Sequence, residues 1–106
     1  MLFLLKVYID KPANASNKEF YSVWLKESQA ALEAVKGGAI KGIWKAAGQP
    51  IVIAIMDLPN HDVLDQAIHQ LPIWKLGYSH IAKNIEIIPI RPYENWAEDL
   101  KTLAEG

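Results

Sequence analysis

Residues 2–9, Leu2-Phe3-Leu4-Leu5-Lys6-Val7-Tyr8-Ile9, decide the fold of this chain. The stretch is rich in residues that favour β-structure, and Lys6 is its single charged residue. Successive side chains of a strand point to opposite faces, and here both alternating sets are largely apolar. A strand of this kind is covered on both faces, so we expect residues 2–9 to form a central strand of a sheet.

The second element is predicted to be a helix from Ser16 to Lys36. Ser16 and Glu19 have the spacing of a capping box, in which each side chain satisfies a backbone N–H at the helix start. Gly37-Gly38 follows the last helical residue, where glycine commonly ends a helix. Periodicity and turn residues then predict the remaining elements. These are strands at 39–46 and 51–56, a helix at 60–70, a strand at 84–90 and a short helix at 93–103.

The order strand, helix, strand, strand, helix, strand predicts a ferredoxin-like α+β fold, with two helices on one face of a four-stranded antiparallel sheet. The first and third strands are apolar on both faces, although the helices cover only one. We therefore expect a second copy of the sheet to cover the bare face, which gives a dimeric α+β barrel. Residues 1–92 would form this barrel domain. Residues 93–106 would form a C-terminal extension, a short helix that contacts a neighbouring subunit.

Composition narrows the classes of function. The 106 residues suit one domain, and the net charge of −1 gives no field that would attract nucleic acid or an anionic membrane. Hydrophobic residues make up 51% of the chain, which favours association between copies. The absence of cysteine excludes disulfides and thiolate chemistry. Lys6 interrupts the apolar start, which lacks the features of a signal peptide, so we expect a soluble, cytoplasmic protein.

Glu27 is the most informative polar residue, because it lies in the apolar stripe of the predicted first helix. At about 100° per residue, Glu27 falls within roughly 20° of Phe20, between Val23 and Trp24. Desolvation raises the pKa of a carboxyl group toward the range in which it works as a general base near neutral pH. The alternative is structural: the side chain reaches a groove edge, or pairs with a lysine of a neighbouring strand.

Several residues at shared spacing resemble the muconolactone isomerase family. They are the start Met1-Leu2-Phe3 with Lys6 and Pro12, then Gly38, Trp44, Ala47-Gly48, Asp57 with Pro59, Leu64 and Gln70-Leu71-Pro72. The resemblance runs without gaps from residue 1 to about residue 74, and it then requires extra residues before the last strand. The tail after Pro92 has no counterpart in the family.

This resemblance implies a dimeric α+β barrel, which in the family often assembles into a ring-like decamer. It also implies cofactor-free isomerisation of an unsaturated lactone in aromatic catabolism, by moving a proton across an allylic system. A first-helix glutamate is the proposed acid/base of the family, and Glu27 stands at its position. Two positions differ from the family: Trp24 replaces a lysine one turn before this glutamate, and Gln49 replaces a histidine after the Ala47-Gly48 turn.

Moving a proton next to a lactone carbonyl requires a base and a group that stabilises negative oxygen. We expect Glu27 to be the base and Lys6, on the central strand, to be the cation. The candidate substrate-binding residues, which would supply donors and walls, are Tyr8, Trp24, Trp44 and Gln49. As alternatives, Tyr8 and Trp44 are interface or core aromatics, and Lys6 forms a structural salt bridge with Glu27.

The three histidines do not predict a metal site. His61 and His69 lie eight residues apart on the second helix, about 80° out of alignment, with no carboxylate at ligand spacing. His80 precedes the last strand and is expected at the surface or at a pocket mouth. No cofactor is expected, and the expected partners are a small-molecule substrate and other copies of the chain. Two other functions stay open: a monooxygenase of the same fold, and a non-catalytic binding or assembly protein.

Overall fold

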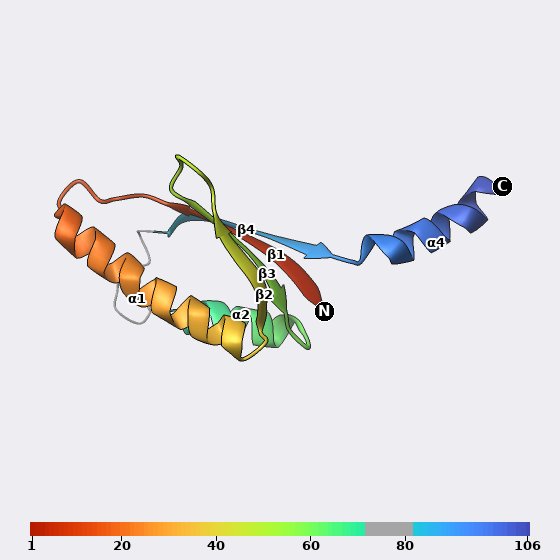
Figure 1. Ribbon diagram of the computed structural model, residues 1–106, viewed down its shortest axis with the longest axis horizontal. Coiled ribbons are helices and arrows are strands. Elements are labelled where there is room, and N and C mark those ends of the chain that lie inside the picture. Colours follow the sequence, from red (N-terminus) through yellow and green to blue (C-terminus); the bar gives the residue numbers. More distant parts are fainter. Residues whose placement is uncertain (72–81) are drawn as a thin grey trace.

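The computed structural model describes residues 1–71 and 82–106, whose arrangement is shown in Figure 1. Four strands form one antiparallel sheet in the spatial order β2-β3-β1-β4. The elements are, in chain order, β1 (Leu2–Ile9), α1 (Asn17–Lys36), β2 (Ile40–Lys45), β3 (Ile51–Asp57), α2 (His61–His69), β4 (Ala82–Ile90) and α4 (Tyr93–Ala104). This topology confirms the predicted ferredoxin-like α+β fold.

β1 is an inner strand of the sheet, as its sequence predicts. It pairs with β3 on one side and with β4 on the other, so that Leu5 lies opposite both Ala54 and Ile87. Along β1, half-buried and fully buried residues alternate without interruption. Pairing on both sides gives the backbone N–H and C=O groups of this largely apolar strand their partners.

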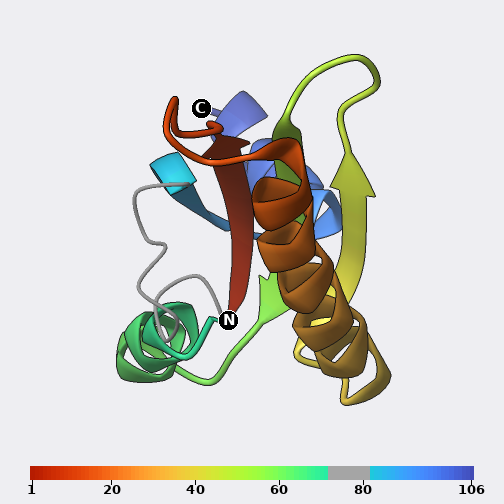
Figure 2. The ribbon, with the colours of Figure 1, turned by 90° about the vertical axis from the view of Figure 1, so that its left-hand side faces the viewer.

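The helices α1 and α2 lie on one face of the sheet (Figure 2). The odd-numbered side chains of β1 point toward these helices, and Phe3 is only 1% exposed. Phe20 and Val23 are the fully buried residues of α1, and Leu64 is that of α2. The buried core consists of Phe3, Leu5, Val7, Ile9, Phe20, Val23, Ile40, Ala54, Met56, Leu58 and Leu64.

Both helices begin at the caps that the sequence predicts. The Ser16 hydroxyl accepts a hydrogen bond of 3.1 Å from the backbone N–H of Glu19, which satisfies an N–H that has no partner inside the helix. The Asn60 side chain does the same at α2, accepting from the N–H of Val63 at 2.9 Å. After α1, Gly38 has a φ of 87°, a left-handed conformation that glycine adopts without strain.

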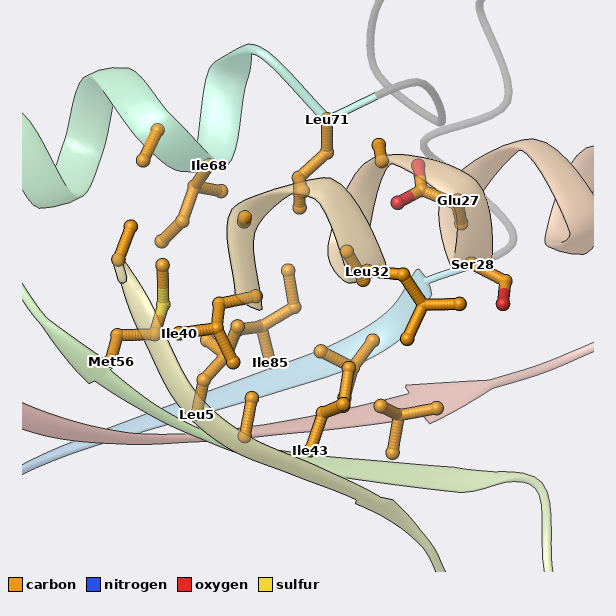
Figure 3. A pocket seen from close by; sticks show the side chains of 18 of the residues that line it. Leu5, Glu27, Ser28, Leu32, Ile40, Ile43, Met56, Ile68, Leu71 and Ile85 are labelled. Atoms are coloured by element: carbon orange, nitrogen blue, oxygen red, sulfur yellow. The ribbon is translucent and has the colours of Figure 1, made fainter. Parts of the chain in front are cut away.

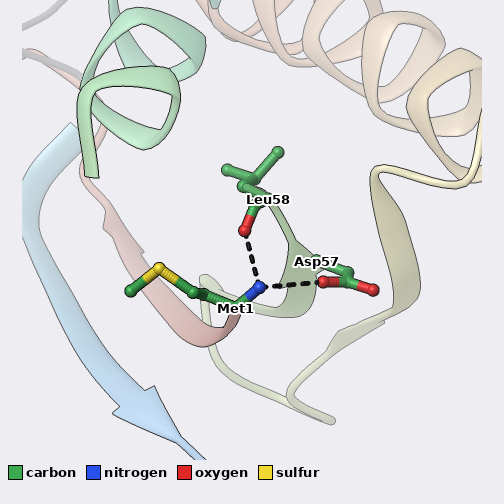
Figure 4. Close-up of polar contacts among 3 residues, drawn as sticks. All are labelled: Met1, Asp57 and Leu58. Atoms are coloured by element: carbon green, nitrogen blue, oxygen red, sulfur yellow. Dashed lines mark hydrogen bonds and ion pairs between the residues drawn. The ribbon is translucent and has the colours of Figure 1, made fainter. Parts of the chain in front are cut away.

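The start of β1 is held against the end of β3 (Figure 4). The amino group of Met1 donates to the backbone carbonyl of Leu58 at 2.7 Å and to the Asp57 carboxylate at 3.3 Å. The N–H of Leu58 in turn donates to the carbonyl of Met1 at 2.9 Å. These bonds continue the pairing of the two inner strands, β1 and β3, beyond the start of β1 and the end of β3.

The even-numbered residues of β1 lie on the second face of the sheet, which α1 and α2 leave uncovered. One row across this face joins Leu4 of β1 to Ile55 of β3 and Ile88 of β4. Leu4 and Ile55 are half-buried, and Ile88 is exposed. An apolar surface on one side of a sheet is a feature that association with another surface would stabilise.

The C-terminal extension contains the predicted helix, α4, which leads away from the sheet (Figure 1). The molecule measures 59 × 27 × 21 Å, and none of the residues of α4 is buried. In the described ranges, 1–71 and 82–106, no helix combines the length and the apolar character needed to cross a membrane.

Candidate functional site

A cavity of about 570 Å³ lies between the two helices and the sheet face that they cover (Figure 3). This volume is in the range of sites that hold small organic molecules. Most of the described side chains around it are aliphatic, because each element turns its apolar face inward. Those labelled in Figure 3 include Leu5, Ile40, Ile43, Met56, Ile68 and Ile85.

Glu27 brings a carboxylate to the edge of this cavity. It lies on the sheet-facing side of α1, where its residue is half-buried, as the helical angle predicts. In Figure 3 its carboxylate lies on the side of the cavity where Leu71 follows α2. A carboxylate at the edge of an apolar cavity is a group that can exchange a proton with a molecule bound there.

Trp24 lies one helical turn before Glu27 and also lines the cavity. Its indole ring stacks on Tyr21 with a centroid separation of 6.5 Å, and it meets the Phe20 ring edge-on at 5.7 Å. These contacts hold the indole in place. Trp24 therefore contributes a flat, rigid wall to the cavity.

Lys45 is a cavity-lining cation that the sequence analysis did not single out. It pairs with Val52 in the sheet, and both residues border the cavity. Its ammonium group donates to the carbonyl of Ala46 at 3.0 Å. The sequence indicates that Lys45 lies on the same face of its strand as Ile43, because the two residues are two positions apart.

Lys6 and Tyr8 lie on the uncovered face of the sheet, across β1 from the cavity. The expectation that Lys6 stands beside Glu27 is wrong within one chain, since the odd-numbered residues of β1 are those that face the helices. The Lys6 ammonium lies 5.1 Å from the centre of the Tyr8 ring, and the Tyr8 hydroxyl donates to Glu86 at 3.4 Å. Interaction with Tyr8, chiefly a side-chain hydrogen bond, raises the pKa of Lys6 above its usual 10.5, and Glu86 adds to this rise.

The other two candidate binding residues have different positions. Trp44 is among the residues that border the cavity, but its ring lies over Gly42 and the residue is 58% exposed. A side chain at Gly42 would overlap this ring, and glycine, which has none, leaves room for the indole. Gln49 is exposed in the turn between β2 and β3, and it is not among the described lining residues.

The described histidines make local contacts. His61 meets the Phe3 ring edge-on at 5.8 Å, and the ring nitrogen Nδ1 of His69 lies 2.9 Å from the Asp65 carbonyl. Within residues 1–71 and 82–106, no three His, Asp or Glu side chains gather as ligands for a metal ion. His80 lies outside the described residues.

A ferredoxin-like sheet with an apolar cavity beneath its helices, and with the Glu27 carboxylate at the edge of that cavity, defines an α+β protein built around a small-molecule-sized site. The family model described as muconolactone delta-isomerase matches residues 1–95. The chain belongs to the muconolactone delta-isomerase family.

Solved structures show the same fold. A crystal structure of muconolactone isomerase has 21% sequence identity and a TM-score of 0.72, covering 87% of this chain and 90% of that chain. The 5-chloro-2-hydroxyhydroquinone dehydrochlorinase of Burkholderia phenoliruptrix AC1100, in complex with 2,5-dihydroxybenzoquinone, has 16% identity and a TM-score of 0.56, with 86% and 94% covered. A comparison with curated proteins gives no significant match.

Proposed function

We propose that this protein is a cofactor-independent isomerase that moves a proton within an unsaturated lactone or a related carboxylate. The observation that carries the proposal is the Glu27 carboxylate at the edge of an apolar cavity in a member of this family. A 2,5-dihydroxybenzoquinone complex is described for the dehydrochlorinase of the same fold, so a small cyclic carbonyl compound is a reasonable occupant. The reaction belongs to aromatic catabolism in the cytoplasm.

Glu27 acts as the base and then as the acid. Its carboxylate removes a proton from a ring carbon, and the electron pair spreads through the double bond to the lactone carbonyl oxygen. The same carboxyl group returns the proton at the other end of the allylic system, so no atom is gained or lost. Positioned acid/base catalysis of this kind typically contributes about 10²–10⁴-fold to the rate.

Lys45 supplies the positive charge in this scheme. β2 follows α1 and contacts it, and both Lys45 of β2 and Glu27 of α1 border the cavity. Its ammonium can exchange the Ala46 carbonyl for an anionic oxygen of the substrate, which is a stronger, charge-assisted contact. Trp24 provides the surface against which a planar ring packs.

The active assembly is a homodimer, in which the uncovered sheet faces of two copies pack together as an α+β barrel. The half-buried Leu4 and Ile55 would become fully buried in this contact. The pair of sheets can assemble further, as in the decamer that the family resemblance implies. Substrate and other copies of the chain are the proposed partners.

The test is solvent-deuterium exchange into candidate unsaturated lactones. We expect the wild type to catalyse exchange and Glu27→Gln to lose it by at least about 100-fold. Glu33→Gln is the matched control, because Glu33 is exposed on the same helix and pairs with Lys36. Equal exchange by the wild type and Glu27→Gln would remove Glu27 as the base. A wild type that binds the lactones without exchange would indicate a binding protein instead.

A further inference from the structure

α4 carries an apolar stripe that the described part of the chain leaves exposed. The stripe consists of Tyr93, Trp96, Leu100 and Leu103, whose spacing places them on one side of the helix. They are 73%, 39%, 39% and 62% exposed, respectively. A helix of this length is marginal in water unless its apolar side packs against something. The stripe therefore indicates a partner surface.

The helix is held away from its own sheet. Pro92 precedes it directly and restricts the backbone at the end of β4. The guanidinium of Arg91 forms an ion pair with Asp99 at 2.8 Å, which ties the first two turns of α4 to the strand end. Figure 1 shows that α4 extends away from α1 and from the rest of the sheet. The partner surface must therefore belong to another molecule.

A second uncovered stripe lies on α1. Tyr21, Leu25, Leu32 and Val35 share one side of this helix and are 60%, 57%, 53% and 36% exposed. This side is turned away from the buried Phe20 and Val23, although Leu32 also reaches the rim of the cavity. Such a position on a helix is normally polar. α1 therefore has one apolar side against the sheet and a second one in solvent.

The two stripes match in size. Each has four large apolar residues, and an aromatic ring buries about 150–250 Å² on contact, so the combined area is on the order of 1,000 Å², the area at which specific contacts between proteins begin. Asp99 borders the α4 stripe, and Lys18 and Lys36 stand about 60° to one side of the α1 stripe. An acidic margin on α4 thus matches a basic margin on α1.

We propose that α4 is an arm that packs along the exposed stripe of α1 in a second copy of this chain. The contact joins two different surfaces, so it adds subunits beyond the sheet-paired dimer and closes into a ring or extends into a chain. The family model ends at residue 95, so Trp96, Leu100 and Leu103 lie beyond it. The arm is therefore a property of this chain, additional to the family fold.

Disulfide trapping tests this contact directly, because the chain contains no cysteine. Full-length Leu25→Cys and Leu103→Cys chains, distinguished by tags, are mixed and oxidised. We expect a mixed disulfide between the two chains. The control mixes Leu103→Cys with Tyr8→Cys, which lies on the uncovered sheet face, and should give none. No mixed product from the first pair, or a product only from the second, would overturn the proposal.

Mass measurement in solution gives an independent test. Leu100→Glu should reduce the assembly to the dimer while lactone exchange is retained, and Leu25→Glu should do the same from the other side of the contact. Thr102→Glu, on the opposite side of α4, should leave the mass unchanged. Because α1 is held by the core, Leu25→Glu remains informative even if the charge unfolds α4 in Leu100→Glu. An unchanged mass in both stripe variants would contradict the arm contact.

Discussion

At the scale of single residues, charge placement distinguishes the two faces of the sheet. Glu27 and Lys45 border the apolar cavity, whereas Lys6 and Glu86 stand on the uncovered face beside Tyr8. Glu27 and Lys45 are the base and the cation of the proposed reaction. On the other face, Lys6, Tyr8 and Glu86 interact with one another.

The cap of α1 provides a prediction at this scale. Ser16→Ala removes the hydroxyl that accepts the Glu19 N–H, and we expect the free energy of unfolding to fall by about 1 kcal/mol. Urea denaturation followed by circular dichroism measures it. Ser22→Ala, in an exposed position inside the same helix, is the control and should leave stability equal or slightly higher. A similar loss in both variants would show that the cap bond is not the cause.

The side of α1 on which Glu27 lies could be predicted from the sequence, but the groups around it could not. A helical angle depends only on residue spacing, so the position of Glu27 on the sheet-facing side could be predicted without a structure. The cation was assigned to Lys6 because its strand is central, although alternation already separated Lys6 from the buried odd-numbered residues. Alternation places Lys45 on the same face as Ile43, but that this face borders the cavity is a property of tertiary structure.

At the scale of elements, local signals determine where helices and strands begin. β1 has the predicted bounds, and α1 and α2 begin after the predicted caps, because a capping side chain needs only its neighbours. The register shift between Ile40 and Gly42 in β2 was not predictable. It lies in the pairing of β2 with β3, next to Gly42, over which the Trp44 ring lies.

The packing of β1 against the helices gives a prediction at this scale. Phe3 is 1% exposed and contacts the ring of His61 at the start of α2, so Phe3→Ala leaves a cavity between the strand and that helix. We expect a loss of about 3–5 kcal/mol in the free energy of unfolding, a large share of the stability of a small domain. Guanidinium denaturation measures it, with the exposed Thr102→Ala, on the side of α4 opposite its apolar stripe, as control. A loss below about 1 kcal/mol would contradict this packing.

At the scale of the whole molecule, the chain has more apolar surface than its own fold covers. Among residues 1–71 and 82–106, three apolar surfaces remain open: the second face of the sheet, the outer stripe of α1 and the stripe of α4. Composition indicated association, with 51% hydrophobic residues, but it could not say which surfaces meet. In the proposed assembly, pairing of the sheet faces would cover the first surface, and the arm contact would cover the other two.

The two contacts can be separated by one comparison of variants. Leu4 lies between Ile55 and Ile88 at the centre of the uncovered sheet face, so Leu4→Asp places a charge in the proposed sheet-to-sheet contact. A twofold contact repeats the substitution in both copies, and burial of each unpaired carboxylate costs several kcal/mol. We therefore expect the dissociation constant of the dimer to rise by at least about 100-fold. Sedimentation measures the resulting monomers.

In a monomer this position is open to solvent on one side, which allows Leu4→Asp to fold, and circular dichroism should confirm its helix and strand content. Leu103→Asp is the matched control, because it places the same charge on an exposed leucine of α4. That variant should lose the larger assembly and keep the dimer. If Leu4→Asp remains dimeric while Leu103→Asp becomes monomeric, α4 and not the sheet face holds the dimer together, and the barrel contact is wrong.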